Sequence, residues 1–118
     1  MRLSEVPFGG LKPVEGYGPD HYRIGGEVWH GPVLACADRV ERWGGFDDLD
    51  RLTALAGTVD VLLVGTGPEI TPLPIHFRRA LEDAGVGVEM MASPTACRSY
   101  NVLLSEGRRV AVALLPAG

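Results

Sequence analysis

An α/β fold, with helices packed on a sheet, is predicted by two patterns in the sequence. After residue 57, short apolar runs typical of buried strands alternate with segments of helical periodicity, in the order strand, helix, strand, helix, strand. The first third is instead rich in glycine and in short β-prone runs, which indicate a β-ribbon or edge elements. Neither half holds enough apolar residues to bury a core separately, so residues 1–118 are expected to form a single domain.

Paired strands around a tight turn are expected in the first third. Residues 21–24 and 27–30 are β-prone, and Gly25 and Gly26 between them favour a hairpin turn. A further β-prone run follows at residues 33–37. These segments are the expected ribbon.

A short amphipathic helix is expected next. Asp47 is placed as its N-cap, because an aspartate side chain accepts hydrogen bonds from the free N–H groups of a first turn. Leu49, Leu52 and Ala56 then share one face. Gly57 is expected to end this helix.

Three apolar runs in the second half predict strands, at residues 61–64, 86–91 and 110–115. The first is continuously apolar with β-branched residues at both ends, which is typical of a strand covered on both faces. The last is apolar throughout. We therefore expect residues 110–115 to form a central strand of the sheet.

Two longer helices are expected between these strands. One begins at about Pro74, a favoured residue at the first helical position, and ends at Gly85. The other begins with Ser93 as N-cap and Pro94 at the first helical position. Gly107 is expected to end it with a left-handed residue.

The composition indicates a globular protein and argues against several function classes. Hydrophobic residues make up 46% and charged residues 22%, which suggests no disordered, fibrous or membrane class. No apolar run approaches the roughly 20 residues that span a bilayer, and the first residues lack a signal-peptide core, so we expect a cytoplasmic protein. A net charge of −4 without a clustered basic face argues against nucleic-acid binding. Cys36 and Cys97 are then expected to be free thiols.

The stretch LLVGTGPE, residues 62–69, raises the question of a phosphate-binding loop. Gly65, Thr66 and Gly67 follow a buried strand, and glycine-rich turns at strand ends bind anions through backbone N–H groups. However, the dinucleotide and P-loop motifs need residues that are absent here, the nearby prolines lack an N–H, and Glu69 repels anions. The favoured interpretation is a stiff turn, and a ligand site is the alternative.

Nucleophilic and metal sites receive little support from the spacing of reactive side chains. Cys97 lies early in an expected helix beside Arg98, which favours a thiolate, but no base lies at a telling spacing. We expect Cys97 to pack as a small apolar side chain. His21, His30 and His76 show no metal-ligand spacing. No catalytic residue, metal or cofactor is therefore expected.

A polar cluster interrupts the apolar sequence near the C-terminus, formed by Arg98, Asn101, Glu106, Arg108 and Arg109. A structural explanation is that Glu106 pairs with an arginine and that Asn101 ties its helix to the loop at residues 65–67. A functional explanation is a shallow polar groove between that loop and the helix. The sequence leaves both explanations open.

Several motifs together resemble a family of small proteins of unknown biochemical activity, which includes a mitochondrial complex I assembly factor and an adipogenesis-associated protein. The resemblance rests on GTGPE at residues 65–69, on Trp43, and on ACRSYNVLLSEGRRVAVALLP at residues 96–116. It covers residues 14–116, and the run from Ala-Cys-Arg-Ser-Tyr-Asn to Glu-Gly-Arg and a closing apolar strand is its most specific part.

The resemblance implies three layers: a central mixed sheet of about five strands, flanking helices and an N-terminal β-ribbon layer. It carries over no catalytic residue. It does carry over a motif whose residues are candidates for a ligand-binding groove: Gly65, Thr66, Gly67, Arg98, Tyr100, Asn101, Glu106 and Arg108. Ala92 stands where the family usually has an aspartate, so this chain lacks that carboxylate.

Two functions are expected as alternatives. The first is a non-catalytic binding or assembly module with a protein partner, of the kind that the resemblance links to a respiratory complex. The second is a site for a small anionic ligand, or a weak enzyme, in a groove between the loop at residues 65–67 and the helix at residues 98–101. The sequence determines neither the partner or ligand nor the oligomeric state.

Overall fold

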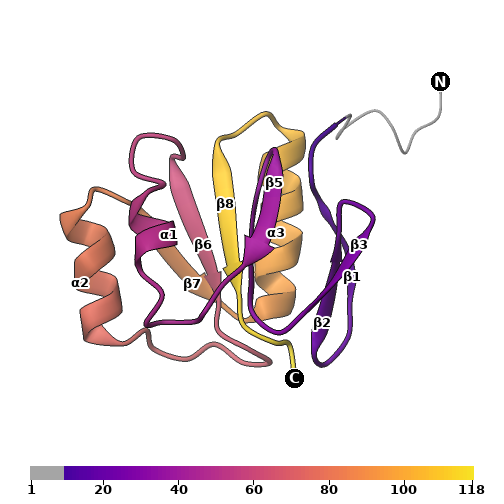
Figure 1. The fold of residues 1–118 in the computed structure, drawn as a ribbon, viewed down its shortest axis with the longest axis horizontal. Coiled ribbons are helices and arrows are strands. Elements are labelled where there is room, and N and C mark those ends of the chain that lie inside the picture. Colours follow the sequence, from indigo (N-terminus) through magenta and orange to yellow (C-terminus); the bar gives the residue numbers. More distant parts are fainter. Residues whose placement is uncertain (1–9) are drawn as a thin grey trace.

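A mixed sheet of five strands forms the centre of the protein (Figure 1). The computed structural model describes residues 10–118. In spatial order the strands are β5 (Arg39–Arg42), β4 (Val33–Cys36), β8 (Val110–Leu114), β6 (Val61–Gly65) and β7 (Val88–Met91). β7, β6 and β8 are parallel, whereas β4 pairs antiparallel with both β8 and β5. β8 therefore joins a parallel half of the sheet to an antiparallel half.

A second, antiparallel sheet of three strands lies beside it, in the order β1 (Val14–Tyr17), β2 (His21–Ile24) and β3 (Glu27–His30). Gly25 and Gly26 connect β2 to β3 with φ angles of 58° and 86°. Only glycine adopts two successive positive φ angles without strain, and this backbone matches the twist of a two-residue hairpin.

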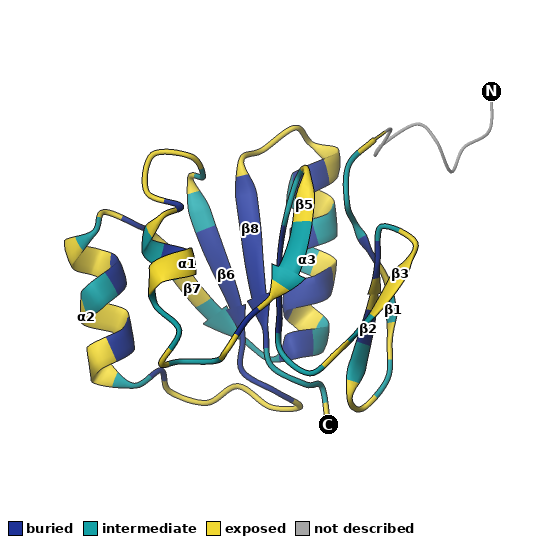
Figure 2. Ribbon diagram, viewed as in Figure 1, coloured by how far each residue is buried: buried dark blue, intermediate teal, exposed yellow. Residues whose placement is uncertain are grey.

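Helices cover both faces of the central sheet. α1 (Asp50–Thr53) and α2 (Ile75–Asp83) pack on one face, and α3 (Ser93–Ser105) and the three-stranded sheet lie over the other (Figure 1). The residues coloured as buried in Figure 2 accordingly lie mainly in β6, in β8 and on the inner sides of the helices. All five residues of β8 are buried because layers cover both of its sides.

The three-stranded sheet shares a hydrophobic cluster with the rest of the molecule. Val14, Tyr22 and Ile24 pack in the same cluster as Leu63 of β6 and Tyr100 of α3. The prediction that residues 1–118 form one domain is supported by this shared core and stays a prediction.

The three-layer α/β fold expected from the sequence is confirmed, with local corrections. β1 and β5 were not predicted, and the run beginning at Val33 forms β4 inside the central sheet. β7 begins at Val88 rather than at residue 86, because the Val86 N–H instead donates to Leu81 O at 2.9 Å. Pro74 is the N-cap of α2, and its ψ of 141° lies outside the helix.

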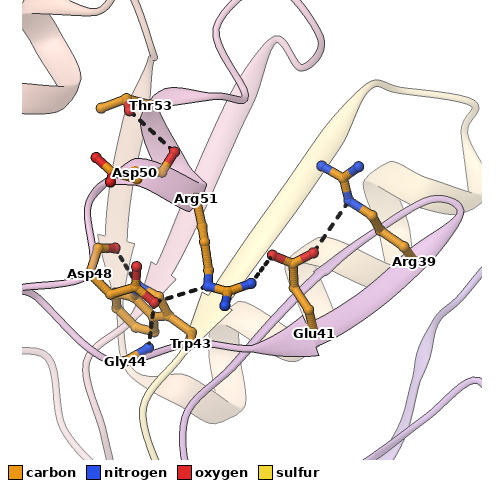
Figure 3. Close-up of polar contacts among 8 residues, drawn as sticks. All are labelled: Arg39, Glu41, Trp43, Gly44, Asp48, Asp50, Arg51 and Thr53. Atoms are coloured by element: carbon orange, nitrogen blue, oxygen red, sulfur yellow. Dashed lines mark hydrogen bonds and ion pairs between the residues drawn. The ribbon is translucent and has the colours of Figure 1, made fainter.

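The helix expected at residues 47–57 is shorter, and Asp47 does not cap it. The N-cap position is Leu49, which makes no side-chain cap hydrogen bond. Asp48 instead turns back, and its Oδ2 accepts from the Gly44 N–H at 2.9 Å and from Arg51 Nε at 3.2 Å (Figure 3). Arg51 also donates to Glu41 Oε1 at 2.8 Å. This network fastens α1 to the edge strand β5.

Candidate functional site

The loop at residues 65–67 satisfies its backbone groups within the protein. Gly65 O accepts from the Leu115 N–H at 2.9 Å, which extends the pairing of β6 with β8. The Gly67 N–H donates to Ser93 Oγ at 2.9 Å, and Gly67 O accepts from the Ser93 N–H at 2.7 Å. The loop is thereby held against the start of α3.

Thr66 forms hydrogen bonds that hold the same loop in place. Its N–H donates to Met91 O at 2.9 Å, and its hydroxyl donates to Glu69 O at 2.8 Å. The hydroxyl also accepts from the Thr71 N–H at 3.0 Å. A phosphate loop presents free N–H groups to its ligand. Both N–H groups at Thr66 and Gly67 are used here, so this geometry supports the stiff-turn interpretation.

Ser93 joins three parts of the chain rather than capping α3. The N-cap position is Ala92, and Ser93 is the first residue of the helix. Ser93 is fully buried, and its Oγ accepts from Gly67 and donates to Leu115 O at 2.8 Å. A buried hydroxyl needs such partners, and here they hold the ends of β6, β8 and α3 together.

Asn101 and Tyr100 face the three-stranded sheet. The Asn101 side-chain amide accepts from the Val14 N–H at 2.9 Å and donates to Val14 O at 2.8 Å. Tyr100 is buried, and its hydroxyl donates to Lys12 O at 2.8 Å. Burial is the main reason why the pKa of Tyr100 is raised. The expected tie from Asn101 to the loop at residues 65–67 is thus replaced by a tie to β1.

Arg98 lies at a hollow of about 350 Å³ between α3 and β7, which we call the edge hollow. It is lined by Leu63, Glu89, Met91, Arg98, Ser99, Val102 and Leu103. The guanidinium is exposed, and its only hydrogen bond within residues 10–118 is a long one to Thr95 Oγ1, at 3.5 Å. The sequence did not indicate the strand side of this hollow, because Glu89 and Met91 come from a strand whose place in the sheet was unknown.

Arg108 lies at the opposite end of α3, in a pocket of about 490 Å³ that we call the arginine pocket. Its lining comes from residues 36–39, 58–59 and 107–110, together with Leu11, Leu55 and Leu104. Glu106 is exposed and forms no ion pair within the described part of the chain. Arg109 instead pairs with Asp60, at 2.6 Å. The eight candidate residues are therefore distributed over separate places, and a ligand-binding role for them stays a prediction.

The two thiols differ in surroundings. Cys97 is buried in the cluster beside Tyr100 and Leu104, and burial raises its pKa to about 12 although Arg98 acts to lower it. Cys36 lines the arginine pocket, and burial is also the largest cause of its raised pKa. Both thiols are therefore protonated at neutral pH, which makes them weak nucleophiles.

Among residues 10–118, no group of three or more His, Cys, Asp or Glu side chains lies close enough to hold a metal ion. In the same range, none of the helices combines the length and apolar character needed to cross a bilayer.

The chain belongs to the family described as "Protein of unknown function (DUF498/DUF598)", which matches residues 14–115. The resemblance expected from the motifs at residues 65–69 and 96–116 is thereby confirmed. An uncharacterised protein of Rhodobacter capsulatus is 52% identical over 116 residues, covering 98% of this chain and 94% of that protein.

A second relative has a descriptive name. The NADH dehydrogenase [ubiquinone] 1 alpha subcomplex assembly factor 3 of Bos taurus is 28% identical over 110 residues. The match covers 87% of this chain but only 60% of the assembly factor. A large part of the assembly factor therefore lies outside the region that matches this chain.

The fold is shared with solved structures. An outer membrane protein from Bartonella henselae superposes with a TM-score of 0.80 at 29% identity, covering 92% of this chain and 98% of that one. A Bordetella pertussis protein described as a Mth938-like domain gives a TM-score of 0.77 at 30% identity, covering 100% and 94%. These likenesses confirm the expected fold class.

Proposed function

We propose that this family member is a non-catalytic protein-binding module that acts in the assembly of a larger complex. The name of the related Bos taurus assembly factor supports respiratory complex I as that complex. The observation that carries the proposal is the edge hollow, where an edge strand and an exposed helix face meet. A cytoplasmic location stays a prediction from the sequence.

The edge strand β7 is suited to receiving a partner. Among the strands of residues 10–118, it is hydrogen-bonded to β6 only. Three of its four residues are apolar, with Glu89 as the single charge. Natural proteins protect free edges with charges, as β5 does with Arg39, Glu41 and Arg42. A partner can add a strand to an unprotected edge through backbone hydrogen bonds.

The helix side of the edge hollow supplies specificity. Val102 is 55% exposed on α3, next to the half-buried Leu103. Arg98 and Glu89 place one cation and one anion in the lining. An extended peptide with an apolar side chain toward Val102 and a carboxylate toward Arg98 fits this arrangement.

The experiment is a pull-down at native expression level with the Val102→Glu variant. Val28→Glu is the matched control, because Val28 is 53% exposed on β3 in the other sheet. We expect complex I subunits to be recovered with the unchanged chain and with the control, and to be lost with Val102→Glu. Equal recovery with both variants would exclude the edge hollow as the interface. Normal complex I assembly after deletion of the gene would contradict the assembly role.

A second candidate function, binding of a small anionic ligand, is favoured by the arginine pocket. The loop at residues 65–67 supports this function less, because its N–H groups already have partners. Thermal-shift assays with anionic compounds test it, since a ligand at 100 times its dissociation constant stabilises the folded state by about 2.7 kcal/mol. No shift with any of them would contradict it.

A further inference from the structure

The arginine pocket combines an apolar floor with a basic rim. Its volume of about 490 Å³ is in the range of small-molecule sites, roughly 300–1,000 Å³. Leu11, Ala37 and Val59 are half-buried and contribute accessible apolar surface from separate segments, above the buried side chains of Leu55, Leu104 and Val110. Its lining residues lie near the start of β6, the start of β8 and the end of α3. These ends of the three elements are at the top of Figure 1.

The charge of the lining is opposite to that of the whole protein. Arg39, Arg108 and Arg109 line the pocket with Asp38 as the only acidic residue, although the chain has a net charge of −4. Asp60 neutralises Arg109, so Arg39 and Arg108 remain against Asp38 in the lining, and this excess of positive charge favours an anion at the rim. Arginine is also the side chain best suited to holding a carboxylate, through two parallel hydrogen bonds.

The three arginines differ in their contacts. Arg109 is occupied, since it donates to Asp60 Oδ1 at 2.6 Å and to Gly57 O at 3.3 Å. Arg39 approaches Glu41 through Nε, at 3.7 Å, and its terminal nitrogens point away from that carboxylate (Figure 3). Arg108 makes no side-chain hydrogen bond or ion pair within residues 10–118. Arg108 and Arg39 are therefore the groups available to an anion.

We propose that the arginine pocket binds a small anionic amphiphile, namely an apolar chain that carries a carboxylate. The carboxylate contacts Arg108 and Arg39, and the chain packs on Leu11 and Val59. The proposal deepens the second candidate function. It does not depend on the protein-binding role, which concerns the edge hollow between α3 and β7.

The first test is a calorimetric titration of the full chain with octanoate. Octanol and octylammonium have the same chain with a neutral and a positive head, and inorganic phosphate supplies an anion without a chain. We expect saturable binding of octanoate and at least about tenfold weaker binding of each comparison compound. Equal binding of octanol would show that only apolar contact is involved and would overturn the proposal, as would absence of octanoate binding.

The second test compares Arg108→Gln with Arg79→Gln. Both arginines are exposed, but Arg79 lies on α2 and only Arg108 lines the arginine pocket. We expect Arg108→Gln to weaken octanoate binding at least about tenfold and Arg79→Gln to leave it unchanged. Unchanged thermal unfolding shows that the variants are folded. Equal affinities of the two variants would overturn the assignment of the anion to this rim.

Alkylation of Cys36 locates the ligand. Cys36 is half-buried in the pocket wall, whereas Cys97 is 4% exposed in the core and serves as internal control. Octanoate is expected to slow the reaction of Cys36 with iodoacetamide in proportion to the fraction of pockets that it occupies. Peptide mass spectrometry measures the rate of this reaction. An unchanged rate at saturating octanoate would place the ligand elsewhere and contradict the proposal.

Discussion

The two ends of the central sheet differ in how their polar groups are used. At the carboxyl end of β6, the loop at residues 65–67 has the glycines of a binding loop, but Ser93 occupies the Gly67 N–H. At the amino end, no glycine motif marks the arginine pocket, yet Arg108 has no partner within residues 10–118. Glycines in a motif can thus serve close packing, whereas a site needs polar groups that remain available.

The largest effect is expected for Gly65→Ala at the carboxyl end of β6. A Cβ atom there would lie 2.8 Å from Ser93 Oγ and 2.9 Å from Ser93 Cα, and the helix backbone has little room to move. We expect the free energy of unfolding to fall by about 3 kcal/mol, measured by urea denaturation. Gly16→Ala is the control, because no atom lies within 4 Å of its added Cβ. Similar losses in both variants would refute the close-packing role of Gly65.

An intermediate effect is expected for Asn101→Ala, which removes a contact near the arginine pocket at the amino end of the sheet. Losing two hydrogen bonds to Val14 should cost about 2 kcal/mol. Leu11 of the arginine pocket packs against the hydrophobic cluster that contains Val14, so the same change should weaken octanoate binding. Hydrogen exchange should accelerate mainly in β1 and β2. Uniform acceleration over the whole chain would contradict a local tether.

The smallest effect is expected for Arg109→Gln, which removes the exposed ion pair with Asp60 beside the arginine pocket. A hydrogen bond from Arg109 is the largest reason why the pKa of Asp60 lies below 3.8. A lowered carboxyl pKa stabilises the folded state above the unfolded value, and this contribution is lost as pH falls through the lowered pKa. Carbon-detected NMR should show that Asp60 titrates at lower pH than an aspartate in an unfolded chain, and Arg109→Gln should raise its midpoint. An unchanged midpoint would show that the pair does not persist in solution.

The helices and strands that could be predicted from the sequence are those with a strong pattern of apolar residues. The apolar residues 110–115 predicted a central strand, and β8 lies between β4 and β6. β1 and β5 were missed because VEGY and RVER have few apolar residues to mark them. Edge strands with one covered face resemble loops in composition. Strand order was also out of reach of local pattern. The resemblance to the family implied a central mixed sheet of about five strands, and the order β5-β4-β8-β6-β7 comes from the structure.

The candidate site was harder to predict because its partners are distant in the sequence. Asn101 contacts Val14, 87 positions away, and nothing near Asn101 indicates this. The lining of the arginine pocket comes from several separate segments, from Leu11 to Val110. Sequence reasoning identified Arg108 as a candidate but placed it at a groove with the loop at residues 65–67.

The position of β8 has a consequence for the order in which the protein is made. Synthesis proceeds from the N-terminus, so β4 and β5 leave the ribosome early, and β6 and β7 follow. Among the strands of residues 10–118, the two pairs are joined through β8 alone, which follows all four strands in the sequence. Each hairpin or strand pair must therefore wait, with an unpaired edge, until β8 has emerged. We expect these long-range pairings to make folding slower than that of helical proteins of this size.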